Sequence, residues 1–87
     1  MTVSDNFEGL IKRVSDSFMR DNIYMIDKNT LAKALMNIDP QCQEKVYRNM
    51  TDDGADIKRM MGGFDNVSAQ EIESAQQQIL SLASQVV

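Results

Sequence analysis

Apolar residues recur three and four positions apart along most of this chain, which is the spacing of one face of an α-helix. In chain order the apolar sets are Phe7, Leu10, Ile11 and Val14; Phe18, Met19, Ile23 and Met25; Leu31, Ala34, Leu35 and Ile38; Cys42, Val46, Tyr47 and Met50; Ile57, Met60 or Met61, and Phe64; and Ile72, Ala75, Ile79, Leu82 and Val86. No stretch sustains the period-two alternation of a strand. The pattern therefore predicts an all-α protein, a compact bundle of five to six short helices.

Helix-capping residues divide these sets into separate elements. We expect the first helix to begin at Ser4 or Asp5, because Glu8 stands three residues after Asp5 as in a capping box. Residues 5–25 can form one helix or two, and the break at Ser15-Asp16 favours two.

The later helices carry clearer start and stop signals. The expected starts are a cap at Asp27, Asp39 followed by Pro40 at the first helical position, Thr51, and a capping box from Ser68 to Glu71. Gly62-Gly63 should end the fifth helix, and residues 64–67 should form a loop.

The length and composition of the chain favour one globular domain. The chain has 87 residues, 43% of them hydrophobic, so we expect a single domain over 1–87. No apolar run approaches the roughly 20 residues that cross a bilayer. The N-terminus lacks the basic start and apolar core of a secretory signal. We therefore expect a cytoplasmic protein without membrane insertion.

The net charge of −4 is carried by the second half of the chain. Residues 51–87 hold six acids against Lys58 and Arg59, whereas residues 1–50 are balanced. Nucleic-acid binding depends on neutralising phosphates, so the acidic half disfavours a nucleic-acid partner. It disfavours an anionic membrane surface for the same reason.

The residue types present offer little for catalysis. There is no histidine, which excludes Ser-His and Cys-His pairs and imidazole metal sites, and no glycine-rich phosphate loop. The one cysteine, Cys42, is expected to be a small buried hydrophobe, although its place in a first helical turn leaves a reactive thiol as the alternative. We expect no enzyme, no cofactor and no metal.

The acids Asp52, Asp53 and Asp56 stand together at the start of the fifth helix. Their spacing fails the calcium-loop pattern, so they read as capping residues on a solvated face. Their functional interpretation is contact with a partner that has a basic patch. Of the adjacent Met60 and Met61, we expect one in the core and the other partly exposed, unless the pair forms an adaptable binding patch.

Two further groups of residues carry structural expectations. The run of three glutamines, Gln76 to Gln78, reads as a solvated face, and Tyr24 and Tyr47 read as core or core-edge residues.

The order of these elements resembles the C-terminal domain of the flagellar motor switch protein FliG. The matching residues are Phe7-Glu8, Leu10, Ile11, Asp27, Leu31-Ala32, Ala34-Leu35, Glu44-Lys45-Val46, Arg48-Asn49-Met50-Thr51, Ala55-Asp56-Ile57, Val67, Ile72-Glu73, Ala75-Gln76-Gln77 and Ile79. The resemblance spans about residues 7–82 and implies the family's six-helix subdomain. It also implies that the helix at about 51–61 matches the charged helix with which the family transmits torque.

The family's torque charges are not retained in this chain. The resemblance implies a basic residue where Asp53 stands and acids where Met60 and Met61 stand, with a lysine near Met36 and an arginine near Ser68. The family's Gly-Pro before the last helix is also absent. The chain contains no counterpart of the family's N-terminal and middle domains, so we expect a stand-alone relative that kept the scaffold and dropped the ordinary motor face.

The predicted function is a non-catalytic protein-interaction module, with contact residues Asp52, Asp53, Asp56, Arg59, Met60 and Met61. The expected partner is a cytoplasmic protein, a flagellar rotor, stator or export component, which would place the chain at the inner face of the membrane. The alternatives are a regulatory or adaptor bundle unrelated to motility and an acidic carrier protein, although no Asp-Ser-Leu attachment site is present. Flagellar genes beside this one would favour the first reading.

Overall fold

The computed structural model describes residues 2–50 and 53–86, and within these ranges it contains helices and no strand. In chain order the elements are α1 (Val3–Arg13), α2 (Asp16–Asn22), the 3-10 turn η1 (Ile23–Met25), α3 (Lys28–Ala34), α4 (Pro40–Arg48), α5 (Asp53–Gly62) and α6 (Ala69–Val86). The all-α prediction is confirmed. The expected division of residues 5–25 into two helices is confirmed too, with η1 added after the second.

Most of the predicted caps are present. The Asp27 carboxylate accepts a hydrogen bond from the Thr30 backbone N–H, and Asp39 caps α4 with Pro40 in its first turn. At α6 the Ser68 hydroxyl accepts a hydrogen bond from the Glu71 backbone N–H, and the Glu71 carboxylate accepts one from the Ser68 backbone N–H, as a capping box requires. α5 ends at Gly62, as expected. The predicted cap Thr51 lies outside the described residues, as does Asp52.

The first helix begins at Val3, one to two residues before the expected start at Ser4 or Asp5. Thr2 is the N-cap of α1, and its hydroxyl accepts from the Asp5 N–H while the Asp5 carboxylate accepts from the Thr2 N–H. Asp5 is therefore the third residue of a capping box rather than its first. Glu8 instead accepts a hydrogen bond from the Asp39 N–H at 3.3 Å, which ties α1 to the start of α4.

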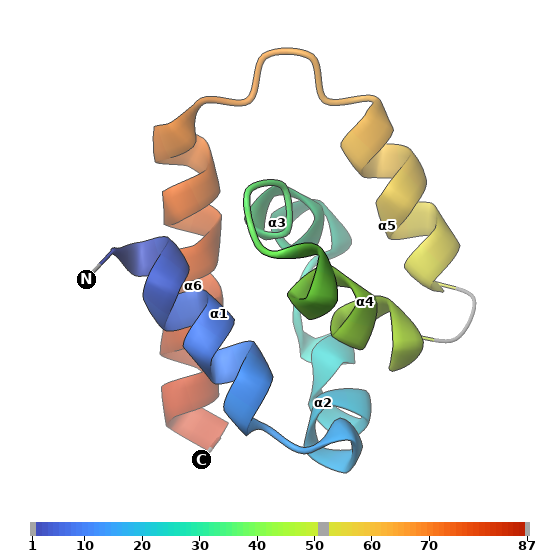
Figure 1. Cartoon of the computed structure of the whole chain (residues 1–87), viewed down its shortest axis with the longest axis vertical. Helices are drawn as coiled ribbons and strands as arrows, with labels where there is room; N and C mark the ends of the chain where they lie inside the picture. Colours follow the sequence, from blue (N-terminus) through green and yellow to red (C-terminus); the bar gives the residue numbers. More distant parts are fainter. Residues whose placement is uncertain (1, 51–52, 87) are drawn as a thin grey trace.

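Helix α3 lies at the centre of the bundle, with α6 on one side and α5 on the other (Figure 1). α1 packs on α6 and on α4, and α4 also contacts α5. The radius of gyration is 11.8 Å, close to the roughly 12 Å expected for a compact chain of this length. α5 is thus an edge helix, joined to α6 by the loop after Gly62 (Figure 1).

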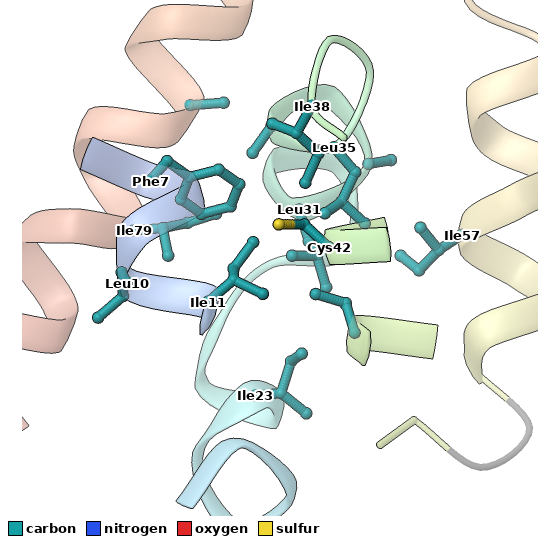
Figure 2. Close-up of a cluster of buried hydrophobic side chains, with 14 of the residues drawn as sticks. Phe7, Leu10, Ile11, Ile23, Leu31, Leu35, Ile38, Cys42, Ile57 and Ile79 are labelled. Atoms are coloured by element: carbon teal, nitrogen blue, oxygen red, sulfur yellow. The ribbon is translucent and has the colours of Figure 1, made fainter. Parts of the chain in front are cut away.

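One hydrophobic core is shared by the helices. Its fully buried members include Leu35 and Ile57 at 0% exposure and Phe7, Leu31 and Cys42 at 2%. Figure 2 shows side chains from α1, α3, α4, α5 and α6 pointing into this one cluster. Most residues of the apolar sets read from the sequence meet here, because each amphipathic helix must bury its apolar stripe against a neighbour.

Gln76 is the main correction to the sequence interpretation. It was expected on a solvated face with Gln77 and Gln78, yet it is 0% exposed, while the other two are exposed. Its amide nitrogen donates to the Ala34 carbonyl (2.9 Å) and to Asn37 Oδ1 (2.8 Å), and its oxygen accepts from the Ser4 hydroxyl (2.9 Å). Ala34 is the last residue of α3, where carbonyls lack partners within the helix. The Gln76 side-chain amide supplies the hydrogen-bond donor that this carbonyl lacks, which explains why a glutamine is buried here.

The expectation for Tyr24 is wrong, and that for Tyr47 is confirmed. Tyr24 is 56% exposed and its neighbour Met25, which the sequence placed in an apolar set, is 57% exposed. Both lie in η1, whose three-residue turn breaks the helical spacing on which the prediction depended. Tyr47 is half-buried and packs against the core from its edge.

Cys42 is a buried thiol on α4 within the hydrophobic cluster (Figure 2). Burial raises the pKa of this thiol, with a smaller contribution from Glu8, so little reactive thiolate is present at neutral pH. We expect alkylation by iodoacetamide to be at least about tenfold slower for the native chain than for the urea-unfolded chain. Mass spectrometry follows the rate of alkylation. Equal rates for the native and unfolded chains would contradict the burial of Cys42 and support a reactive thiol.

Asp16 makes the fold sensitive to acid. Its Oδ1 accepts hydrogen bonds from the Asn49 amide at 2.9 Å and from Arg48 at 3.1 Å, and these bonds, in that order, lower the pKa of Asp16. Because the folded-state pKa lies below the unfolded value of about 4, ionised Asp16 stabilises the fold above that pH. The contribution is lost as the pH falls through the lowered folded-state pKa.

We therefore expect the thermal midpoint of the natural chain to fall more steeply below about pH 4 than that of Asp16→Asn, which cannot titrate. Circular dichroism melts between about pH 2.5 and 7 measure both curves. Parallel curves over the acid range would show that the Asn49 and Arg48 bonds do not stabilise the charged form.

Candidate protein-interaction site on α5

Helix α5 is held to the bundle by its inner side. Ile57 is fully buried, and Gly54 lies so close to α4 that a Cβ there would stand 3.3 Å from the Tyr47 carbonyl oxygen. That distance is tighter than ordinary van der Waals contact, so glycine permits the close approach of the two helices. The side of α5 that carries Ala55, Lys58 and Arg59 is exposed.

Met60 and Met61 are both half-buried and packed against the core, so one is partly exposed as expected but the other is not fully buried. The Tyr47 hydroxyl donates to the Met61 sulfur at 3.2 Å, and the Lys58 ammonium lies 4.6 Å from the centre of the Tyr47 ring. Burial, followed by Glu44, raises the pKa of Tyr47. Tyr47 therefore remains a neutral hydroxyl that fastens the last turns of α5 to α4.

The two described acids of the cluster, Asp53 and Asp56, share a cation from another helix. The Lys28 ammonium at the start of α3 lies 3.1 Å from Asp53 Oδ1 and 3.4 Å from Asp56 Oδ2. Arg59 Nη1 lies 3.4 Å from Asp56 Oδ1, one helical turn along α5. The side chains are 29% exposed for Asp53, 43% for Asp56 and 49% for Lys28, so solvent and salt screen these ion pairs and they are weak.

These pairs change the charge predicted for this surface. We define the α5 face as Lys28, Asp53, Asp56, Lys58 and Arg59. It holds two carboxylates and three cations, so it is mixed in charge rather than acidic. The sequence missed Lys28, which stands 25 positions before Asp53 with no local pattern joining the two.

Hollows also lie elsewhere on the described surface, one apolar and one more polar. An apolar cavity of about 80 Å³ lies between α1, α2, η1 and α6, bordered by residues such as Val14, Phe18, Met25 and Leu82. A more polar hollow lies between the start of α3 and α6, beside Asp27, Lys33 and Glu71.

Neither a metal cluster nor a membrane span is found in the described ranges. Over 2–50 and 53–86, no three Cys, Asp or Glu side chains are grouped to hold a metal ion. No helix in this part of the chain has the length and apolarity needed to cross a bilayer.

The sequence matches the FliG C-terminal domain family over residues 6–87. This chain belongs to that family. A comparison with curated proteins and one with solved structures each found no match. The resemblance read from the sequence is confirmed over nearly the whole chain, and the all-α fold agrees with it. FliG C-terminal domains are interaction domains of the flagellar motor switch, without catalytic chemistry.

The structure describes the five positions at which the resemblance implies charged residues in the FliG family. Asp53 is paired with Lys28, and Met60 and Met61 pack against the core. Met36 is half-buried after α3, and Ser68 is the cap of α6. Asp53, where the resemblance implies a basic residue, has an ammonium group 3.1 Å away, supplied by Lys28 of α3.

Proposed function

We propose that this chain is a non-catalytic protein-interaction module of the flagellar motor that works in the cytoplasm. The observation that carries the proposal is the FliG C-terminal domain match over residues 6–87. No step of the proposed work requires a reactive group. The partner class is a flagellar rotor, stator or export protein.

We propose further that the α5 face is the contact surface. α5 is an edge helix packed on α3 and α4, and its outward side carries charged groups on a backbone fixed by the buried Ile57. A rigid element that presents charges can select a partner by complementary charge, which governs specificity and encounter rate more than affinity. Asp52, next to this helix in the sequence, belongs to the same proposal, as do Met60 and Met61 as its apolar border.

The test is capture of purified flagellar rotor, stator and export proteins by the immobilised chain. We expect Asp53→Lys combined with Asp56→Lys to reduce capture at least about tenfold, because two attractive carboxylates become repulsive cations. Each reversal also places a cation beside Lys28, so circular dichroism must first show that the variant is folded.

The matched control is Asp21→Lys combined with Glu73→Lys. Both residues are exposed on other helices, and the pair changes the net charge by the same amount. Capture that falls equally in the two double variants would show a net-charge effect and refute the α5 face. If the natural chain captures none of these proteins, the proposed role in the flagellar motor is refuted.

A further inference from the structure

The apolar cavity between α1, α2, η1 and α6 is not used by the proposed contact surface. Its volume is about 80 Å³, and α3 and α4 each add a residue to its walls. Most of the wall side chains are buried, among them Phe7, Ile11 and Ile79 at 5% exposure or less. Met25, also in the wall, is 57% exposed. The cavity therefore runs from the hydrophobic core to the surface beside Met25.

The walls of the cavity are almost entirely apolar. Asn22 is the one residue with a polar side chain among those that line it, and its amide nitrogen donates to the Phe18 carbonyl at 2.8 Å. Over residues 2–50 and 53–86, no buried side-chain nitrogen or oxygen lacks a hydrogen-bond partner. A charged or hydrogen-bonding ligand would lose its bonds to water here without replacing them. The walls therefore select an uncharged hydrocarbon.

The volume of the cavity limits the size of that ligand. An engineered apolar cavity of roughly 150 Å³ in another protein stays free of water and takes up benzene or xenon. The cavity in this chain has about half that volume, so a benzene ring needs a small outward shift of one wall. The backbones of α2 and η1 can supply the shift, because they pack mainly on each other. The unbranched Met25 side chain can move aside at the surface.

We propose that this cavity is a binding site for a small, uncharged hydrocarbon group of about the size of a benzene ring. The group enters beside Met25 and lies against side chains of α1 and α6. None of the lining residues belongs to α5. Ligand binding in the cavity and partner contact at the α5 face are therefore separate properties, and the failure of one leaves the other standing.

The probe is benzene, titrated into the isotope-labelled chain and followed by methyl NMR shifts. We expect saturable shifts at Leu10, Ile79 and Leu82, which line the cavity, and little change at Ile57 and Ile72, which do not. Pyridine has the same shape but carries a ring nitrogen that accepts hydrogen bonds from water. It should bind at least about fivefold more weakly, because the walls offer that nitrogen no donor. Equal binding of the two rings, or shifts that do not saturate, would overturn the inference.

The matched variants are Ala83→Leu, which fills the cavity, and Ala69→Leu, the same change at an exposed position of α6. We expect benzene to bind at least about tenfold more weakly to Ala83→Leu and within about twofold of the natural chain to Ala69→Leu. Circular dichroism melts establish that both variants are folded. Benzene affinity that is unchanged in Ala83→Leu would overturn the inference.

A second variant tests the cavity in the opposite direction and does not depend on the folding of Ala83→Leu. Val46 is a buried wall residue, so Val46→Ala enlarges the cavity without widening its mouth. We expect this variant to bind p-xylene, a longer ring, at least about threefold more tightly than the natural chain does. Equal affinity for p-xylene would show that hydrocarbons do not bind in this space.

Discussion

Replacing Ile57 with alanine should lower the free energy of unfolding by about 2–5 kcal/mol, the range for truncating a fully buried aliphatic side chain. Ile57 is 0% exposed and is the apolar residue by which α5 enters the core, facing α3 and α4 (Figure 2). A domain of this size is stable by roughly 4–13 kcal/mol, so the change removes a large share of the total. Urea unfolding followed by circular dichroism measures it.

The control for Ile57 is Ile26→Ala, which removes the same atoms from a half-buried side chain. We expect that variant to lose less than about half as much, because fewer contacts are broken and water can reach the site. If Ile57→Ala cost less than about 1 kcal/mol, α5 would not be anchored as described. The claim that its outward charges sit on a fixed backbone would then fail.

Replacing Gln76 with alanine should cost about 2–4 kcal/mol, a large effect for a residue in a run of three glutamines. The variant removes a donor from the Ala34 carbonyl and from Asn37, and an acceptor from the Ser4 hydroxyl. A buried polar group left without its partner costs about 1–3 kcal/mol, and the vacated space adds to this.

The neighbour Gln77 provides a control within the same helix. It is exposed, so Gln77→Ala should change stability by no more than about 0.5 kcal/mol. Ser4→Ala should also cost less in the Gln76→Ala background than in the natural chain, because its acceptor is already gone. Similar losses for Gln76→Ala and Gln77→Ala would contradict the buried network.

The elements that the sequence predicted well are those whose signals are local. Asp27, Asp39 with Pro40, and Ser68 with Glu71 act on N–H groups within three residues, so their effect can be read from spacing alone. The core-facing stripes follow from helical periodicity in the same way. The Thr2 cap was missed because Asp5 was assigned as the first residue of a capping box with Glu8, whereas it is the last residue of the box that begins at Thr2.

The features that the sequence missed depend on residues far apart in the chain. The burial of Gln76 follows from a carbonyl at the end of α3, 42 positions earlier, and the pairing of Asp53 depends on Lys28. Neither contact leaves a periodic trace. The sequence therefore predicted an acidic cluster on α5 but not the Lys28 side chain that pairs with it. The surface is mixed in charge because α3 packs beside α5 and places Lys28 next to Asp53 and Asp56.

The most direct test that α5 is the contact face is an amide chemical-shift map. The isotope-labelled chain is titrated with whichever flagellar rotor, stator or export protein it captures. We predict the largest shifts over residues 53–62 and at Lys28, with little change around the apolar cavity between α1, α2 and α6. Shifts centred on Phe18, Met25 and Leu82, with α5 unmoved, would contradict the assignment and place the partner in that cavity.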